Sequence, residues 1–184
     1  MSDNDGNNAL WNGNNAFWTF SLNVYAASGV EAECLALQGT HEVDVNLLLF
    51  CAWAGAERRW RLAPADLDRL RQAVRPWQET VVKPLRSARR AIKMLGLPNP
   101  AASDLRSRIA TDELGAEQIE QAMLFALASR EGCANNPGGE VDVSAFVRDN
   151  IALLLKGCAA TLPEALIAAA ARAAAPRRAA ARFP

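Results

Sequence analysis

The sequence predicts an all-α fold: a compact helical bundle with a central apolar helix at about 44–56, a long proline-interrupted helix at about 65–95, and a helical C-terminal extension. Apolar residues recur every three or four positions along most of the chain, which is the period of one helix face. No run alternates between apolar and polar residues over the length of a strand. Residues that cap helix N-termini also stand just before several apolar stretches, so the helical signals agree with one another.

Composition divides the 184 residues into five expected segments. The Asn- and Gly-rich stretch at 1–14 is predicted to be a disordered tail, and a helical domain is expected at 15–131. A linker at 132–141 precedes the helical extension at 142–175, and an Ala/Arg-rich tail follows at 176–184. Packed helices are therefore expected in two stretches of the chain.

Two helices are expected at the start of the domain. Apolar residues cover most sides of a helix at about 16–27, which predicts that it is largely buried. The spacing Ser28-Gly-Val-Glu31 is that of a capping box and predicts a short second helix. Gly39 is expected to end that helix, because glycine commonly follows a helix C-terminus.

The central helix begins after Asp44, a residue type that caps helix N-termini well. From Val45 to Ala56 only Asn46 is polar, so the helix is predicted to be buried on all sides. A parallel strand is the rival interpretation of so apolar a run. The length of about twelve residues and the alanines favour a helix.

Pro64 is expected in the first turn of the long helix, a position that tolerates proline. The apolar stripe that follows steps by three or four: Leu67, Leu70, Val74, Trp77, Val81, Leu85, Ala88, Ile92 and Leu95. Pro76 and Pro84 interrupt it. Each removes a backbone donor and clashes one turn back, so a break near residue 75 and a kink near residue 84 are predicted. Gly96 is expected to stop the helix.

Three further helices are predicted after the long one. Asp112 is expected to cap a helix at 113–130 with four residues facing inward: Ile119, Met123, Leu124 and Leu127. Asp142 is expected to cap a helix at about 143–157. A capping box from Thr161 to Glu164 is expected to open the last helix, at about 162–175.

The formal net charge is zero, but the charges are segregated along the chain. Residues 1–57 carry −7, residues 58–108 carry +9, residues 109–157 carry −5, and residues 158–184 carry +3. Zero net charge therefore excludes a protein coated in positive charge and leaves room for one basic face.

The basic face lies on the predicted helix at 76–95, where four cations fall within about 80° of one another and a fifth flanks them. Its members are Lys83, Arg86, Arg90 and Lys93, flanked by Arg89. Three interpretations remain open. The face is solvated, or it pairs with an acidic stripe formed by Glu113, Glu117 and Glu120, or it binds phosphates, an anionic membrane surface or an acidic partner helix.

Trp60 is a candidate binding residue, because it stands among the three cations Arg58, Arg59 and Arg61. An aromatic ring among cations can stack on a base or anchor a protein contact. The alternative is a tryptophan folded back over the ends of the helices. Trp11, in the polar tail, resembles a docking residue without a visible partner.

The sequence predicts no catalytic, cofactor-binding or metal-binding residue, because no motif for such a site is present. His41 is the one histidine, and with Asp44 and Asn46 it forms a candidate polar cluster before the central helix. A nucleophilic partnership of His41 with Cys34 or Cys51 would need an exposed thiol with a lowered pKa. Packed cysteines are the favoured interpretation.

A cytoplasmic location is expected. The first residues lack the basic and apolar regions of a secretory signal, and the longest apolar run, Leu47–Gly55, is too short to span a bilayer. The four cysteines lie far apart without a C-x-x-C pair, which favours reduced thiols.

Three strings occur in order: FWTFSLNVYAASGVEAECLALQ, VDVNLLLFCAWAG and VVKPLRSARRAIK. Together they resemble a family of short proteobacterial proteins known as a domain of unknown function, over about residues 16–130. Glu33 and Gly39 depart from the family's pattern, which has Ala and Asp there. The resemblance implies a small helical protein and implies no activity.

The expected function is a non-enzymatic protein-interaction module that uses the basic face together with Trp60 to bind a protein partner or a second copy. Nucleic-acid or anionic-lipid binding by the same face is one alternative. A small helical enzyme with a site near His41 and Asp44 is another. Neither alternative requires a bound cofactor.

Overall fold

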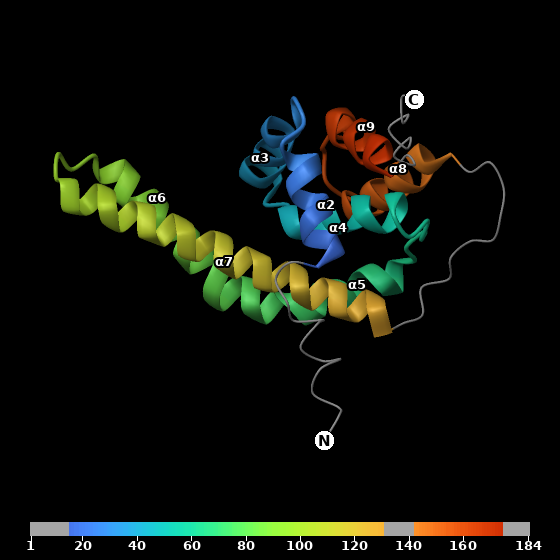
Figure 1. Ribbon diagram of the computed structural model, residues 1–184, viewed down its shortest axis with the longest axis horizontal. Helices are drawn as coiled ribbons and strands as arrows, with labels where there is room; N and C mark the ends of the chain where they lie inside the picture. Colours follow the sequence, from blue (N-terminus) through green and yellow to red (C-terminus); the bar gives the residue numbers. More distant parts are fainter. Residues whose placement is uncertain (1–14, 131–141, 175–184) are drawn as a thin grey trace, which may run out of the picture. The chain divides into compact units, whose positions relative to one another are not determined.

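The computed structural model describes residues 15–130 and 142–174, and every regular element in these ranges is a helix (Figure 1). The predicted all-α class is therefore confirmed. The predicted tails at 1–14 and 176–184 and the linker at 132–141, with Trp11, lie outside the described residues.

The described chain divides into two compact units. Residues 63–130, with residues 15–19, form one of them, called here the hairpin unit. Residues 20–62 and 142–174 form the other, called the bundle unit.

The bundle unit is built around α4, which spans Val45–Ala56. Its other helices are α3 (Val30–His41), α8 (Val143–Leu154) and α9 (Glu164–Ala173), preceded in the chain by α2 (Ala16–Tyr25). Every residue of α4 from Asn46 onward is buried. The most extensive packing of α4 is against α8, and α9 contacts α3, α4 and α8. The predicted apolar helix is therefore the centre of this unit.

The start of α4 follows the sequence rule. The Asp44 side chain accepts hydrogen bonds from the backbone N–H groups of Asn46 at 2.9 Å and Leu47 at 3.3 Å. These bonds satisfy two of the amides that a helix leaves unpaired in its first turn. The predicted cap is confirmed.

The ends of α3 and α9 differ from the sequence predictions. Gly29, in a left-handed conformation at φ 85°, precedes α3, so the capping box on Ser28 is wrong. The helix also runs through Gly39 and ends before Glu42, which takes the left-handed conformation instead. The box on Thr161 is likewise wrong, because α9 begins at Glu164.

A carboxylate from α3 caps α9 in place of that box. The two oxygens of Glu33 accept hydrogen bonds from the backbone N–H groups of Ala165 and Leu166, each at 3.0 Å. Glu164 is engaged elsewhere, in two hydrogen bonds from Arg148 at 2.6 and 2.7 Å. A negative charge is favourable at a helix N-terminus, so Glu33 anchors α9 to α3.

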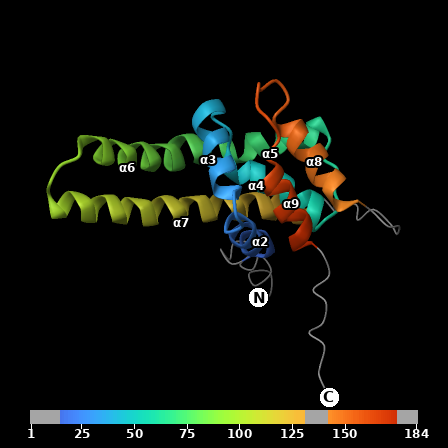
Figure 2. The same cartoon turned by 90° about the horizontal axis from the view of Figure 1, so that it is seen from above.

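The hairpin unit consists of two antiparallel helical segments that lie side by side (Figure 2). The first contains α5 (Pro64–Trp77), the π-helical turn η1 (Gln78–Val82) and α6 (Lys83–Leu95), and the second is α7 (Pro100–Arg130). Gly96, left-handed at φ 57°, ends α6 as predicted. The Trp77 indole N–H donates to the carbonyl of Ala116 at 2.9 Å and fixes one segment against the other.

The break predicted near residue 75 is wrong, because the helix passes Pro76 and continues into η1. A π turn is wider than an α turn, which makes room for a proline ring beside the preceding carbonyls. The Thr80 hydroxyl donates to the carbonyl of Pro76 at 2.6 Å, and Pro84 falls in the first turn of α6. The two prolines are thus absorbed without ending the helix.

The predicted start of α7 is also wrong. The helix begins at Pro100 and not after Asp112, because Asn99 accepts a hydrogen bond from the N–H of Ala101 at 2.9 Å and caps it there. Of the four residues expected to face inward, Leu124 is fully buried, whereas Ile119 is 44% exposed.

Candidate interaction surface

Part of the basic face predicted on α6 forms ion pairs with acidic residues of the hairpin unit. Arg86 Nε donates to Glu113 Oε1 at 2.9 Å, and Arg86 Nη2 donates to Glu117 at 2.5 Å. Arg89 Nε donates to the second oxygen of Glu113 at 2.5 Å. Two cations of α6 are therefore directed at α7.

Glu113 is the centre of this cluster. Its side chain is 7% exposed and that of Arg86 is 15% exposed. Burial alone would raise the pKa of Glu113, but the hydrogen bonds and charges of Arg89 and Arg86 outweigh it and hold the pKa below its ordinary value. The carboxylate is therefore ionised at neutral pH and joins the two helical segments.

Replacing Glu113 by glutamine should destabilise the protein by about 1–3 kcal/mol at pH 7, because Arg86 and Arg89 lose the carboxylate to which both donate. A carboxyl with a depressed folded-state pKa stabilises the fold above its unfolded pKa, and that contribution disappears as pH falls through the folded-state value. The difference between Glu113→Gln and wild type should therefore shrink at about pH 3. Urea unfolding followed by circular dichroism at both pH values measures it.

The matched control for Glu113 is Glu79→Gln. Glu79 pairs with Lys83 at 2.7 Å with both side chains about half exposed, so its loss should change stability by less than about 0.5 kcal/mol. Equal effects of the two substitutions at pH 7 would contradict the central role of Glu113.

The remaining cations of the predicted face point outward. Arg90 and Lys93 are exposed, and no ion pair involving either of them is found in the described part of the chain. The predicted face therefore separates into an internal pair, Arg86 and Arg89, an outward pair, Arg90 and Lys93, and Lys83, which pairs with Glu79 one turn earlier.

Large apolar side chains are exposed where α6 turns into α7 and, at Leu105, in the second turn of α7. Met94 is 85% exposed, Leu95 67%, Leu97 56% and Leu105 43%. We call these four residues, with Arg90 and Lys93, the hairpin end. Soluble proteins rarely gather so many large apolar side chains at one exposed point without a use for them.

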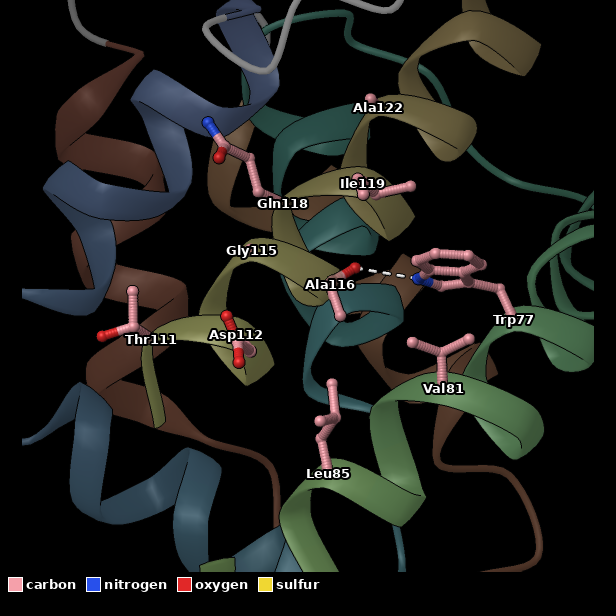
Figure 3. A pocket seen from close by; sticks show the side chains of 10 residues that line it. All are labelled: Trp77, Val81, Leu85, Thr111, Asp112, Gly115, Ala116, Gln118, Ile119 and Ala122. Carbon is pink, nitrogen blue, oxygen red and sulfur yellow. Dashed lines mark hydrogen bonds between the residues drawn. The ribbon is translucent and has the colours of Figure 1, made fainter. Parts of the chain in front are cut away.

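A groove of about 550 Å³ runs between the two segments of the hairpin unit (Figure 3). Trp77, Val81 and Leu85 form one wall, and Ile119 extends from α7 towards the tryptophan. The α7 residues that complete the lining are Thr111, Asp112, Gly115, Ala116, Gln118 and Ala122. Asp112 is the one titratable residue in the lining, so the groove lacks the paired groups that acid–base chemistry needs.

Trp60 lies in the bundle unit, half-buried and packed edge-on against Phe50 with 6.3 Å between the ring centroids. Its carbonyl accepts a hydrogen bond from Asn150 at 2.8 Å. Arg61 forms an ion pair with Asp149 at 2.9 Å. The ring therefore folds onto the core beside α4.

The candidate polar cluster is not gathered around one cavity. His41 lines a cavity of about 240 Å³ with Glu33, Thr40 and Thr161, and neither Asp44 nor Asn46 lines it. Asp44 caps α4, and Asn46 is buried.

The Cys34 thiol is fully buried. Burial and the neighbouring charge of Glu33 raise its pKa to about 12, so it is protonated at neutral pH and unsuited to nucleophilic attack. Cys51 is buried as well.

No group of three or more His, Cys, Asp or Glu residues in ranges 15–130 and 142–174 is arranged to hold a metal ion. Within the same ranges, none of the helices combines the length and the apolar character needed to cross a membrane.

Sequence reasoning missed the apolar half of the hairpin end and two residues that organise the bundle unit. The sequence places Leu95 at the end of the apolar stripe of the long helix, and nothing in it indicates that Met94, Leu95 and Leu97 are exposed together. Glu33 and Asn150 act on segments more than eighty residues away, so no local pattern reveals them.

A family model described as a protein of unknown function (DUF2390) matches residues 16–124 of the chain. This match confirms the resemblance to a domain of unknown function over residues 16–124. No curated protein and no solved structure matches the chain.

Proposed function

We propose that this chain, which belongs to the DUF2390 family of proteins of unknown function, is a non-enzymatic interaction module that docks through its hairpin end. One observation carries the proposal: four large apolar side chains are exposed beside Arg90 and Lys93, two cations without ion pairs in the described residues. Apolar contact supplies affinity, and the cations select a negatively charged partner.

The internal ion pairs support this role. Arg86 and Arg89 hold α6 against Glu113 on α7, and Trp77 bonds to α7 further along. A surface held rigidly before binding loses less conformational entropy when a partner arrives. The hairpin end is thus supported by the residues behind it.

The chemistry of the hairpin end narrows the partner class. Single-stranded nucleic acids are commonly held by aromatic side chains that stack on bases, and the hairpin end contains no aromatic side chain. Two hairpin ends carry charge of the same sign and repel each other, which disfavours a second copy. An acidic protein face and an anionic bilayer both match.

Photo-crosslinking in cells tests the proposal. We expect p-benzoylphenylalanine at Ser103, an exposed position in the first turn of α7, to give adducts that the same group at the exposed Gln72 does not give. Mass spectrometry of the adducts then separates protein from lipid.

Reversing the two outward cations, as Arg90→Glu with Lys93→Glu, should reduce the Ser103 adducts about tenfold or more, because attraction becomes repulsion. The matched control, Arg75→Glu with Lys156→Glu, makes the same charge change at exposed cations elsewhere and should leave the adducts unchanged. Equal yields from the two double variants would refute docking by the hairpin end.

A further inference from the structure

We propose that the partner of the hairpin end is the surface of an anionic bilayer, into which the turn between α6 and α7 inserts. The inference rests on the proposed function and names the partner of the same surface. Three features of the hairpin end favour a bilayer over an acidic protein face, and a fourth, its charge, makes that bilayer an anionic one.

The first feature is where the apolar side chains stand. Met94 and Leu95 end α6, Leu97 lies in the turn, and Leu105 lies on α7. They are therefore contributed by both segments and by the turn between them, and do not form a stripe along one helix. A fluid bilayer surrounds an apolar end on all sides, whereas a protein must supply a fitted pocket.

The second feature is the distance of the cations from the turn, measured along the helices. A helix rises 1.5 Å per residue, so Lys93 lies roughly 3 Å and Arg90 roughly 8 Å back from the end of α6. Arg106 and Arg108 lie roughly 9 to 12 Å along α7 from its start at Pro100. The headgroup layer of one leaflet is about 5–8 Å thick. Insertion of the turn would therefore bring the nearest cations to the phosphates.

The third feature is the backbone of the turn. The N–H groups of Gly96, Asn99, Ala102 and Ser103 donate to carbonyls within the turn, and the N–H of Ala101 donates to the Asn99 side chain. Pro98 and Pro100 have no N–H. Except for that of Leu97, every backbone N–H of the turn is therefore already hydrogen-bonded within the protein. This favours insertion, because the bilayer core offers such groups no partners.

The fourth feature is charge. From Lys83 to Thr111 the chain has seven cations and one acid, Asp104. Arg86 and Arg89 are neutralised by Glu113 and Glu117, and Lys83 is paired with Glu79. Arg90, Lys93, Arg106 and Arg108 are the cations left for anionic headgroups.

Co-sedimentation of the full chain with lipid vesicles tests the inference. The probe is phosphatidylcholine vesicles with about 30 mol% phosphatidylglycerol, compared with phosphatidylcholine alone. We expect binding to the anionic vesicles, weak binding to the neutral ones, and a loss of binding when salt is raised from about 0.1 to about 0.5 M.

Two double variants separate the contributions. Arg90→Glu with Lys93→Glu and, independently, Met94→Ser with Leu97→Ser should each lower the partition coefficient about tenfold or more. Leu22→Ser with Leu35→Ser removes apolar side chains that are 52% and 50% exposed in the other unit, and should change it less than about twofold. Circular dichroism of each variant checks that the helices persist.

Absence of wild-type binding to both vesicles overturns the inference, as does equal binding to neutral and anionic vesicles. Full binding by the Met94→Ser, Leu97→Ser variant refutes insertion. If vesicle binding fails while Ser103 still crosslinks to a protein, the proposed function stands and the bilayer is excluded as the partner. If both experiments fail, the docking role of the hairpin end is refuted.

Discussion

Replacing Gly55 by alanine should destabilise the bundle unit by about 2 kcal/mol or more. A Cβ atom at this position would stand 2.7 Å from the backbone nitrogen of Val147 and 2.8 Å from the carbonyl carbon of Phe146, both in α8. These are backbone atoms, so no side-chain rotation relieves the clash. The two helices must move apart, and close-packed contacts along the most extensive interface of the unit loosen.

The matched control for Gly55 is Gly39→Ala in α3. A Cβ atom there meets nothing within 4 Å, so the exchange should stabilise the helix by about 0.5–1 kcal/mol through lower backbone entropy in the unfolded chain. The same substitution is thus expected to act with opposite signs at two helical positions. Urea unfolding of both variants measures this, and a Gly55→Ala variant as stable as wild type would contradict the close approach of α4 and α8.

The features that sequence reasoning predicted correctly depend on neighbouring residues. Asp44 caps α4 because its side chain reaches amides two and three residues ahead, and Gly96 ends α6 because it tolerates a left-handed backbone. The errors occur where a distant or competing residue decides. Glu33 replaces the Thr161 box from another helix, and Asn99 starts α7 before Asp112 can.

The pairing of the basic face on α6 could not be predicted from the sequence, because it too depends on a distant segment. A helical projection placed five cations together on α6, yet which of them meet Glu113 depends on how α6 is rotated against α7. The π turn η1, inserted just before α6, shifts that rotation relative to α5. The projection consequently left internal pairing and partner binding as open alternatives. In the structure Arg86 and Arg89 pair with α7, Lys83 pairs with Glu79, and Arg90 and Lys93 face outward.

Replacing Asn150 by leucine should destabilise the protein by about 2–4 kcal/mol. Asn150 is fully buried in α8, and its oxygen accepts a hydrogen bond from the N–H of Leu62 at 2.8 Å. Its amide nitrogen donates to the carbonyls of Trp60 at 2.8 Å and Cys51 at 3.2 Å. One side chain thus ties the segment after α4 to both α4 and α8. Leucine keeps the branching at Cγ and the number of side-chain heavy atoms but removes all three bonds, so the N–H of Leu62 loses its acceptor and the carbonyls of Trp60 and Cys51 lose a donor.

Two comparisons separate loss of these bonds from a general effect of substitution. Asn23→Leu, at an exposed position in α2, should change the free energy of unfolding by less than about 0.5 kcal/mol. Asn150→Asp keeps the acceptor for Leu62 but faces a buried carboxylate towards two carbonyl oxygens. Because burial and those carbonyls raise the folded-state pKa of such a carboxyl, this variant should be closest to wild type below about pH 4 and lose stability as pH rises. Thermal unfolding of Asn150→Asp and wild type at pH 4 and pH 7 measures this dependence. If the difference in stability between them does not change with pH, the carboxyl is solvated. The hydrogen bonds of Asn150 would then be open to water, contrary to the structure.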